Sequence, residues 1–331
     1  MAHKTRFWPA IAISAGVALA ALCLTPLAGS TTIDYARAFA GESPHREILF
    51  ETRLPRVLLA LLAGGALASA GVLFQGLLRD ALATPYTLGI SSGASLGAVL
   101  AISLGLREIG HLPGVWAASF AGAGLVLFLV LGIASEGRRL SSFTLLLAGV
   151  SINTICLALI LFLQYTAGFA QNFAIVRWLM GGLETTGYGV IAGLAAVLLP
   201  SLGYVLLRAR DWNLLAVGED WAAARGVNVS RLLWSGYLLG SLITGSVTAL
   251  TGPIGFVGLI IPHALRLRLG ADHRVLLPCA FFWGAAFLAV CDTLARTVLA
   301  PSEIPVGIVT ALIGGPFFIW LLRSRRRSLW L

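Results

Sequence analysis

The sequence predicts an all-α integral membrane protein with ten transmembrane helices. Of its 331 residues, 58% are hydrophobic and only 11% are charged, whereas about a quarter of the residues in a soluble domain carry charge. The mean hydropathy is +0.90. Uncharged runs near or above the roughly 20 residues that cross a bilayer as a helix recur along the chain. Because lipid offers the backbone no hydrogen-bond partner and the runs do not alternate, we expect helices rather than a barrel.

Most apolar runs supply one expected helix each, but two runs are too long for a single crossing. We divide the run 140–176 into a helix to about residue 165 and a surface segment that contains Arg177. The run 232–265 is interrupted by Gly252 and Pro253, a combination typical of a turn or an unwound corner. Within a single domain of residues 1–331, the expected helices span about 8–29, 57–77, 88–106, 112–134, 142–165, 188–207, 232–250, 255–269, 275–298 and 305–322.

The first apolar run, which begins at Phe7, follows Lys4 and Arg6 and so has the charge order of a signal peptide. It is longer than the roughly 7–15 residues of a signal-peptide core. We therefore expect a retained first helix rather than a cleaved leader.

The basic residues report the orientation of the chain in the bilayer. The net charge is +9, and all but one of the 23 basic residues are arginine. Ten helices put both termini on one side. If that side is the cytoplasm, inner segments hold sixteen basic residues and outer segments hold seven, as the positive-inside rule requires. The positive charge is thus a signal of topology, and we expect no nucleic-acid partner.

The chain lacks the residues of an ATP-driven motor. A phosphate-binding loop ends in Gly-Lys-Ser/Thr, and Lys4 is the only lysine. If transport is driven by ATP, the hydrolysis belongs to a separate subunit that carries ATP and Mg²⁺, and this chain is not an enzyme and binds no cofactor of its own. The cysteines lack the spacing of a metal or redox site, so we expect no metal ligands and no catalytic residues.

One acidic residue, Asp292, is expected at membrane depth, where ionisable groups often serve transport. It precedes Arg296 by four residues and therefore shares a helix face with it. We favour an Asp292–Arg296 ion pair over a proton relay. A proton-coupled secondary transporter that uses Asp292 remains the alternative from another class. An intramembrane enzyme is disfavoured, since His263 has no carboxylate or nucleophile near it in sequence.

Three groups of motifs occur in a fixed order between about residues 50 and 323. The first is Arg53-Leu-Pro-Arg56 followed by the loop 79–89, and the second is the segment 218–229. The third begins with Gly-Pro-Ile-Gly-Phe-Val-Gly at 252–258 and continues through Asp292-Thr-Leu-Ala-Arg296. Together they resemble the FecCD/BtuC family, the permease subunits of type II ABC importers.

The resemblance implies a ten-helix BtuC-like permease in the bacterial inner membrane, with both termini in the cytoplasm. It implies a homodimer that works with two ABC ATPase subunits and a periplasmic substrate-binding protein. Iron(III)–siderophore is the first expected cargo, with haem and cobalamin (vitamin B12) as alternatives. The helices are not rich in Met or His, which argues against transport of a naked metal ion.

The resemblance also assigns roles to two polar groups of residues. Arg53, Arg56 and Arg296 would dock carboxylates of the binding protein, a pairing that suits guanidinium groups. The alternative interpretation is that these side chains extend to the phosphate groups of the lipids. The loop 209–230 would couple the permease to the ATPase. Its segment from Glu219 to Gly226 is predicted to be a short amphipathic helix closed by glycine. The coupling residues are Glu219, Asp220, Ala223 and Gly226.

Gate and pathway residues follow from the same resemblance. Helix 142–165 would line the path, and the inner gate would lie in two neighbouring loops. The candidates are Asp80, Leu82, Ser141 and Ser142 for the gate, and Asn153 and Gln164 for the pathway. This chain has Asp80-Ala81 where the family commonly has Asn-Pro. Gly89, Gly93 and Gly97 form a small-residue stripe, which we interpret as helix packing rather than pore.

Overall fold

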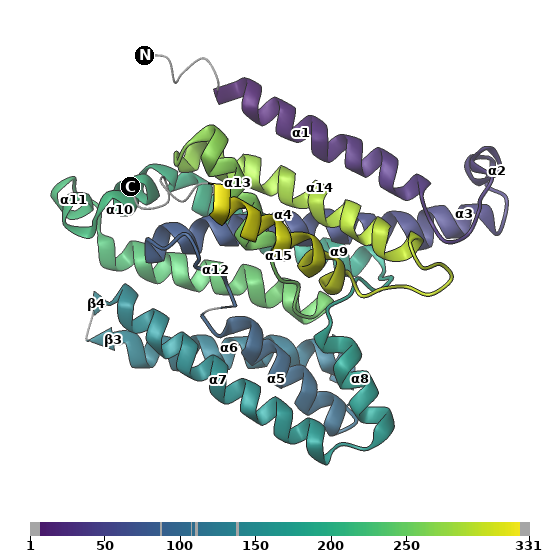
Figure 1. Ribbon diagram of the computed structural model, residues 1–331, viewed down its shortest axis with the longest axis horizontal. Coiled ribbons are helices and arrows are strands. Elements are labelled where there is room, and N and C mark those ends of the chain that lie inside the picture. The colour runs from purple at the N-terminus through teal and green to yellow at the C-terminus, as the bar shows by residue number, and fades with distance from the viewer. Residues whose placement is uncertain (1–6, 87, 107, 110–111, 137–138, 325–331) are drawn as a thin grey trace.

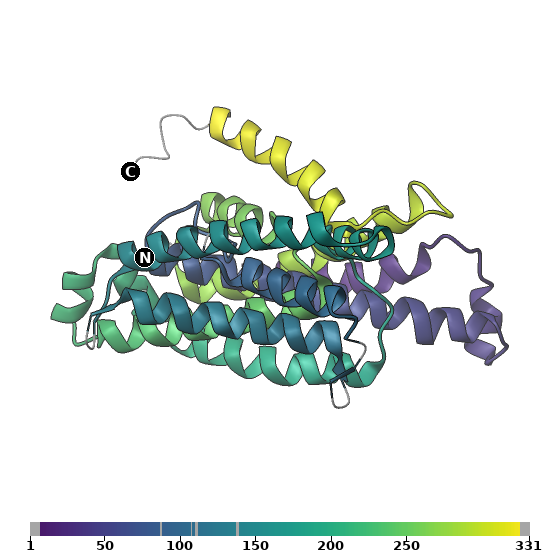
Figure 2. The same ribbon diagram turned by 90° about the horizontal axis from the view of Figure 1, so that it is seen from below.

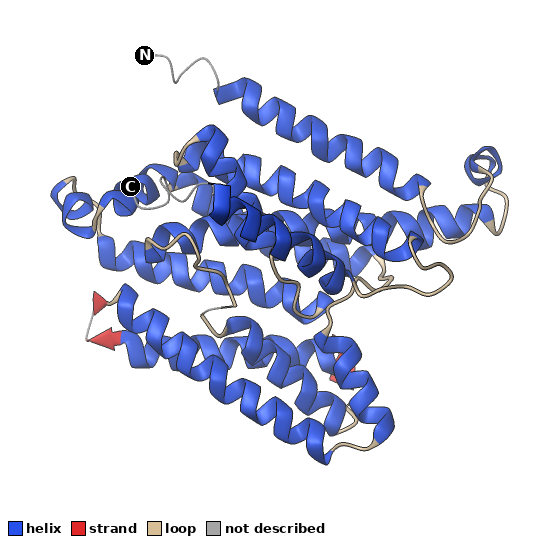
Figure 3. Ribbon diagram, viewed as in Figure 1, coloured by secondary structure: helices blue, strands red, loops and turns tan. Residues whose placement is uncertain are grey.

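The computed structural model describes residues 7–86, 88–106, 108–109, 112–136 and 139–324, and nearly all of this part is helical (Figure 3). Most helices run along the long axis of one elongated bundle (Figure 1). The helices are α1 (Phe7–Leu24), α2 (Tyr35–Ala40), α3 (His45–Glu47), α4 (Leu54–Leu78), α5 (Ile90–Ser103), α6 (Gly114–Ala134), α7 (Ser142–Thr166), α8 (Phe169–Leu179), α9 (Tyr188–Leu207), α10 (Ala209–Val217), α11 (Glu219–Ala224), α12 (Val229–Thr251), α13 (Val257–Leu269), α14 (His273–Thr297) and α15 (Val306–Ser324).

Short irregular elements complete the chain. A 3-10 turn, η2 (Thr25–Leu27), follows α1, and a π-helical stretch, η3 (Ile48–Arg53), leads into α4. Strands β1 (Glu108–Ile109) and β2 (Leu112–Pro113) form one antiparallel pair, and β3 (Ser135–Glu136) and β4 (Arg139–Leu140) form another. These pairs flank α6 and serve as tight connections between helices.

Each of the ten expected helices overlaps one helix of the structure, which confirms the all-α membrane class. Within the described residues, seven helices are long and apolar enough to cross a bilayer. Two of the others are shorter: α5 has 14 residues and α13 has 13. At about 1.5 Å per residue each spans only about 20 Å of a hydrocarbon core of about 30 Å. The count of ten crossings therefore stays a prediction.

The expected surface segment around Arg177 is the helix α8, most of whose residues are exposed. The chain leaves α7 at Thr166, and the backbone N–H of Gly168 donates to Gln171 Oε1 at 3.3 Å as α8 begins. The side chain of Ile175 is fully buried, in a small cluster with Val99 and Ile160. Burial of Ile175 holds this largely exposed helix against the bundle, and such tertiary packing stabilises a short helix.

Side-chain caps define where several helices begin. Asp34 accepts hydrogen bonds from the first turn of α2, and Ser141, Asn228 and Asp272 do the same for α7, α12 and α14. Short polar side chains at these positions satisfy backbone N–H groups that lack an intrahelical partner. These capping residues lie between the apolar runs and determine at which residue each helix begins.

Helix α4 forms the centre of the bundle and packs against α12, α13 and α14. Two glycines bring its backbone into contact with its neighbours. A Cβ added to Gly64 would lie 2.3 Å from the carbonyl oxygen of Gly284, and one added to Gly71 would lie 1.9 Å from that of Gly258. Helices approach this closely only where small residues face each other, so α4 is locked to α13 and α14 along its length.

A second glycine contact joins α5 to α6. A Cβ on Gly97 would lie 2.1 Å from the carbonyl oxygen of Ala118, and a Cβ on Gly122 would lie 2.2 Å from that of Gly93. The predicted packing role of the stripe at Gly93 and Gly97 is thereby confirmed. With α7 and α8, these helices form a group that α12 separates from α14 in Figure 1. Figure 2 shows that α15 leans away from the other helices.

Candidate functional site

Polar residues gather at the two ends of the bundle. One end carries α2, η3 and the loop between α14 and α15, and we call it the arginine end (Figure 1). The opposite end carries α10 and α11, and we call it the α11 end. The predicted docking arginines lie at the first end and the predicted coupling residues at the second.

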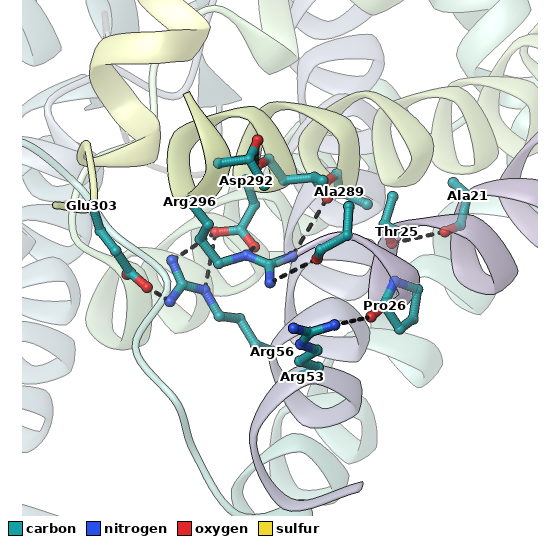
Figure 4. A network of polar contacts seen from close by, with 12 residues as sticks. Ala21, Thr25, Pro26, Arg53, Arg56, Ala289, Asp292, Arg296 and Glu303 are labelled. Carbon is teal, nitrogen blue, oxygen red and sulfur yellow. Dashed lines mark hydrogen bonds and ion pairs between the residues drawn. The ribbon is translucent and has the colours of Figure 1, made fainter. Parts of the chain in front are cut away.

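A buried ion-pair cluster occupies the arginine end (Figure 4). Its centre is Asp292 on α14, which is 0% exposed. Arg296 donates from Nε to Asp292 Oδ2 at 3.0 Å, which confirms the expected ion pair. Arg56 on α4 is a second partner, with Nε and Nη2 at 3.1 and 3.0 Å from Oδ1. The negative charge of Asp292 is thus shared between two guanidinium groups, a geometry that disfavours a proton relay at this residue.

Arg56 also reaches a second carboxylate outside the helices. Its Nη1 donates to Glu303 Oε2 at 2.8 Å. The Glu303 side chain is 47% exposed, whereas that of Arg56 is 11% exposed. Arg56 therefore joins the buried core of the cluster to a carboxylate at the surface.

The connection between α1 and α2 covers the other two arginines. Arg53 Nη1 donates to the carbonyl oxygen of Pro26 at 3.1 Å, and its Nη2 donates to that of Thr31. Arg296 Nη1 lies 3.5 Å from the carbonyl oxygen of Ala28. Backbone oxygens of this connection thus accept hydrogen bonds from both guanidinium groups.

The three predicted docking arginines are therefore buried rather than open at the surface. Arg53, Arg56 and Arg296 are 4%, 9% and 5% exposed. The docking role remains a prediction, and it requires that a partner displace an internal contact. Of the three, Arg56 is the one bound to a half-exposed side chain.

A cavity of about 770 Å³ opens beside the cluster at the arginine end. Arg56 and Glu303 line it, together with a looser ion pair between Arg177 and Glu184, whose Nη2 and Oε1 lie 3.9 Å apart. Trp116 and Trp178 also line it. The cavity thus combines paired charges with flat apolar surfaces.

At the opposite end, the predicted coupling helix is present as α11. It spans Glu219–Ala224 and is closed by Gly226, whose φ of +82° favours glycine. Ala222 is fully buried, whereas Trp221 is 61% exposed. Asp220 and Ala223 are also exposed. The helix is therefore fixed by one face and presents the other to solvent.

Helix α11 is tied to the end of the central helix. Glu219 Oε1 lies 3.1 Å from Nη2 of Arg79, the residue that follows α4. Both side chains are well exposed, so the pair contributes about 0–1 kcal/mol to stability. Its importance is in placing α11 next to the end of α4.

A second contact ties α10 to the first turn of α14. Asn213 Nδ2 donates to Asp272 Oδ1 at 2.8 Å, and Asn213 Oδ1 accepts from the backbone N–H of His273 at 2.8 Å. Asp272 is also held by Arg274, whose Nη2 lies 2.6 Å from Oδ2. The loop 209–230 is therefore anchored to α14 as well as to α4.

The environment of Asp272 predicts an acid-dependent loss of stability. The hydrogen bond from Arg274, helped by Asn213, lowers the pKa of Asp272 from an ordinary 3.8 to about 2, although partial burial opposes the shift. Because the folded pKa is the lower one, the ionised form stabilises the protein above pH 4, and this contribution disappears as the pH falls from about 4 to 2. Asp272→Asn should therefore melt below the wild type at pH 6 and approach it at pH 2. Melting of the detergent-solubilised protein across this range checks the prediction, and a constant difference at all pH values would contradict it.

The predicted gate residues lie in loops near the α11 end. Asp80 Oδ1 accepts from the backbone N–H of Leu82 at 2.9 Å, and the Leu82 side chain is 52% exposed. Ser141 caps α7 by accepting from the backbone N–H of Thr144 at 3.3 Å. Ser142 is the first residue of α7, but its side chain lies outside the described residues. The gate role of this group stays a prediction.

The predicted pathway residues share one face of α7. Asn153 and Gln164 are separated by three helical turns, or about 16 Å, and both are partly exposed. They lie beside the buried face formed by Ile152, Cys156 and Ile160. Their position at the edge of the packed surface is compatible with a path along α7, which stays a prediction.

Comparison with known proteins identifies the family. The FecCD transport family matches residues 17–324, which is nearly the whole chain. The protein belongs to the FecCD transport family. It is therefore a membrane permease of this family.

Individual relatives of this FecCD chain carry several transport names. It is 40% identical to the hemin transport system permease protein HmuU of Yersinia pestis, over 85% of this chain and 84% of that protein. It is also 40% identical to the cobalamin import system permease protein BtuC of Halobacterium salinarum, over 89% and 79%. A solved structure described as an inward-facing metal-chelate type ABC transporter aligns with 96% of this chain and 99% of its own, at a TM-score of 0.83 and 31% identity.

The structure adds site residues of the FecCD chain that sequence reasoning missed. Glu303 lies in the loop between α14 and α15, and its contact with Arg56 spans 247 positions and leaves no local pattern. Asn213 lies 59 residues before Asp272 and reads in sequence as an ordinary loop residue. The sequence did contain one indication of the Glu303 contact, because an arginine near the outer membrane edge, such as Arg56, requires a negatively charged partner.

Proposed function

We propose that this FecCD chain is the permease subunit of an ATP-driven importer that moves a metal chelate into the cytoplasm by alternating access. The observation that carries the proposal is the near full-length structural similarity to a metal-chelate type ABC transporter. The arginine end faces the periplasm and receives the binding protein. The α11 end faces the cytoplasm, where the ATPase and both termini lie, and the excess of arginines in those segments supports this orientation.

The proposed cargo is an iron(III)–siderophore, with haem and cobalamin as the alternatives. Two relatives named for hemin and cobalamin share the same level of identity with this chain, so the shared chemistry is a large, closed metal chelate. Binding of ferric siderophores, haem and cobalamin to the partner binding protein, measured as one panel, tests the choice among them.

Coupling would pass through the two contacts that tie α10 and α11 to long helices. In the proposed homodimer, each of two ATPases binds one exposed face of α11. A movement of α11 reaches α4 through Arg79–Glu219, and it reaches α14 by way of the neighbouring α10 through Asn213–Asp272. The far ends of α4 and α14 meet at Arg56 and Asp292. Because α4 and α14 are long helices, a movement that the ATPase causes at the α11 end can be transmitted along them to the periplasmic end.

The decisive test is uptake by proteoliposomes that contain this chain with and without its ATPase. We expect uptake of the radiolabelled chelate only with the ATPase, ATP and the binding protein. Uptake that follows a proton gradient without ATP would contradict the proposal and favour a secondary transporter that uses Asp292.

Removal of the exposed aromatic side chain on α11 tests the coupling role directly. Large aromatic side chains dominate many interfaces, so Trp221→Ala should lower binding-protein-stimulated ATPase activity by at least about tenfold. The matched control is Trp8→Ala, which removes a similarly exposed tryptophan from α1 and should leave the activity unchanged. Equal activity of Trp221→Ala and the wild type would show that α11 does not bind the ATPase.

A further inference from the structure

Arg56 holds two carboxylates that differ in how firmly they are fixed. Its Nε and Nη2 bind Asp292, which is fully buried on α14. Its Nη1 binds Glu303, which lies in the loop between α14 and α15 and is 47% exposed. The Glu303 contact can therefore open while the Asp292 contacts remain.

The Glu303 contact also faces the space through which a partner would arrive. Arg56 and Glu303 both line the cavity of about 770 Å³ at the arginine end. Arg53, by contrast, donates to backbone oxygens of the covering connection between α1 and α2 and to the Tyr35 hydroxyl, and Arg296 donates to the buried Asp292 and to one backbone oxygen of that connection. Among the docking arginines, Arg56 therefore presents a contact that an incoming carboxylate can exchange, with Glu303 as the group already in place.

The charges of the cluster favour binding of another carboxylate once the contact between Arg56 and Glu303 is broken. Arg56 and Arg296 balance Asp292 and Glu303. Without Glu303 one positive charge is uncompensated at the wall of the cavity. A guanidinium that is mostly withdrawn from water binds a carboxylate more strongly than one at an open surface.

We propose that Glu303 is an internal competitor for the carboxylate of the substrate-binding protein at Arg56, and that it limits the affinity of docking. The proposal rests on the docking role proposed above. It makes Glu303 a residue that tunes the partner interaction and predicts a gain of affinity when an acidic side chain is lost, which structural damage would not produce.

The first experiment measures binding of the purified partner substrate-binding protein to the permease in nanodiscs. Glu303→Gln should lower Kd about fivefold, the range expected for release of one partly exposed ion pair. The control is Glu42→Gln, which removes a carboxylate paired with the exposed Arg37 at 3.8 Å and should change Kd by less than about twofold. Unchanged or weaker binding of Glu303→Gln would overturn the proposal, as would an equal gain in the control.

The second experiment needs no partner protein. Phenylglyoxal modifies accessible arginine side chains, and peptide mass spectrometry reports the fraction of Arg56 that has reacted. Glu303→Gln should raise the labelling rate of Arg56 several-fold and leave that of Arg53 unchanged. An unchanged rate at Arg56 would overturn the masking role of Glu303.

The two readouts separate the competitor role from the docking function beneath it. Wild-type binding without a gain in Glu303→Gln would refute the competitor and leave docking intact. If Arg56 is labelled faster in Glu303→Gln but neither the wild type nor this variant binds the partner, docking at Arg56 is refuted. The competitor role of Glu303 is then refuted as well.

Discussion

Asp292→Leu is expected to destabilise the protein by about 3–5 kcal/mol, the cost of breaking a buried ion pair by removing one partner. The substitution leaves the guanidinium groups of Arg56 and Arg296 facing each other, although both are nearly withdrawn from solvent. Neither can move to water without displacing Glu303 or the connection between α1 and α2. We therefore expect little monodisperse protein, and a melting temperature far below that of the wild type in detergent.

The control for Asp292→Leu is the same change at a more exposed ion pair. Asp211 lies 2.7 Å from Arg208 near the α11 end, and its side chain is 27% exposed. Asp211→Leu should cost no more than about 1 kcal/mol. If Asp292→Leu melts at the same temperature as Asp211→Leu, the cluster is not an important source of stability.

Gly71→Val is expected to prevent correct assembly of the bundle. Its Cβ would lie 1.9 Å from the backbone oxygen of Gly258, so the contact can be relieved only by moving α4 away from α13. Overpacking of a core typically costs 1–3 kcal/mol, and more where backbone must shift. We expect loss of the folded fraction in fluorescence-detected size-exclusion chromatography.

A matched glycine in another helix separates packing from helix propensity. Gly132 on α6 has no atom within 4 Å of an added Cβ. Gly132→Val introduces the same β-branched residue into a helix and should remain folded, because only a weak propensity difference is involved. Equal loss of folded protein in both variants would contradict the steric explanation.

Local sequence features account well for the class of fold and the position of most helices. Long apolar runs between charged residues predicted the helices, because the backbone in lipid has no other stable arrangement. Asp292 and Arg296 were paired correctly because they lie four residues apart on one helix. Gly226 was placed correctly at the end of α11, since glycine tolerates its positive φ. Each of these features depends on residues within one or two helical turns.

Features that depend on distant residues were not predictable in the same way. The segment around Arg177 became helical because Ile175 is buried among residues of other helices. Two of the arginines expected at an open surface, Arg53 and Arg296, are covered by a connection that lies at least 22 positions earlier in the chain. The distance in space between segments that lie far apart in the chain cannot be derived from a single sequence.

The sequence by itself therefore determined that this protein is a helical membrane permease, and where most of its helices lie. Hydrophobic length and hydrogen-bond satisfaction in lipid are local properties and can be read from the order of residues. Only the tertiary structure decided that Arg56 binds Asp292 and Glu303 from more than 230 positions away. That choice depends on the close approach of α4 and α14, which small residues such as Gly64 and Gly284 permit.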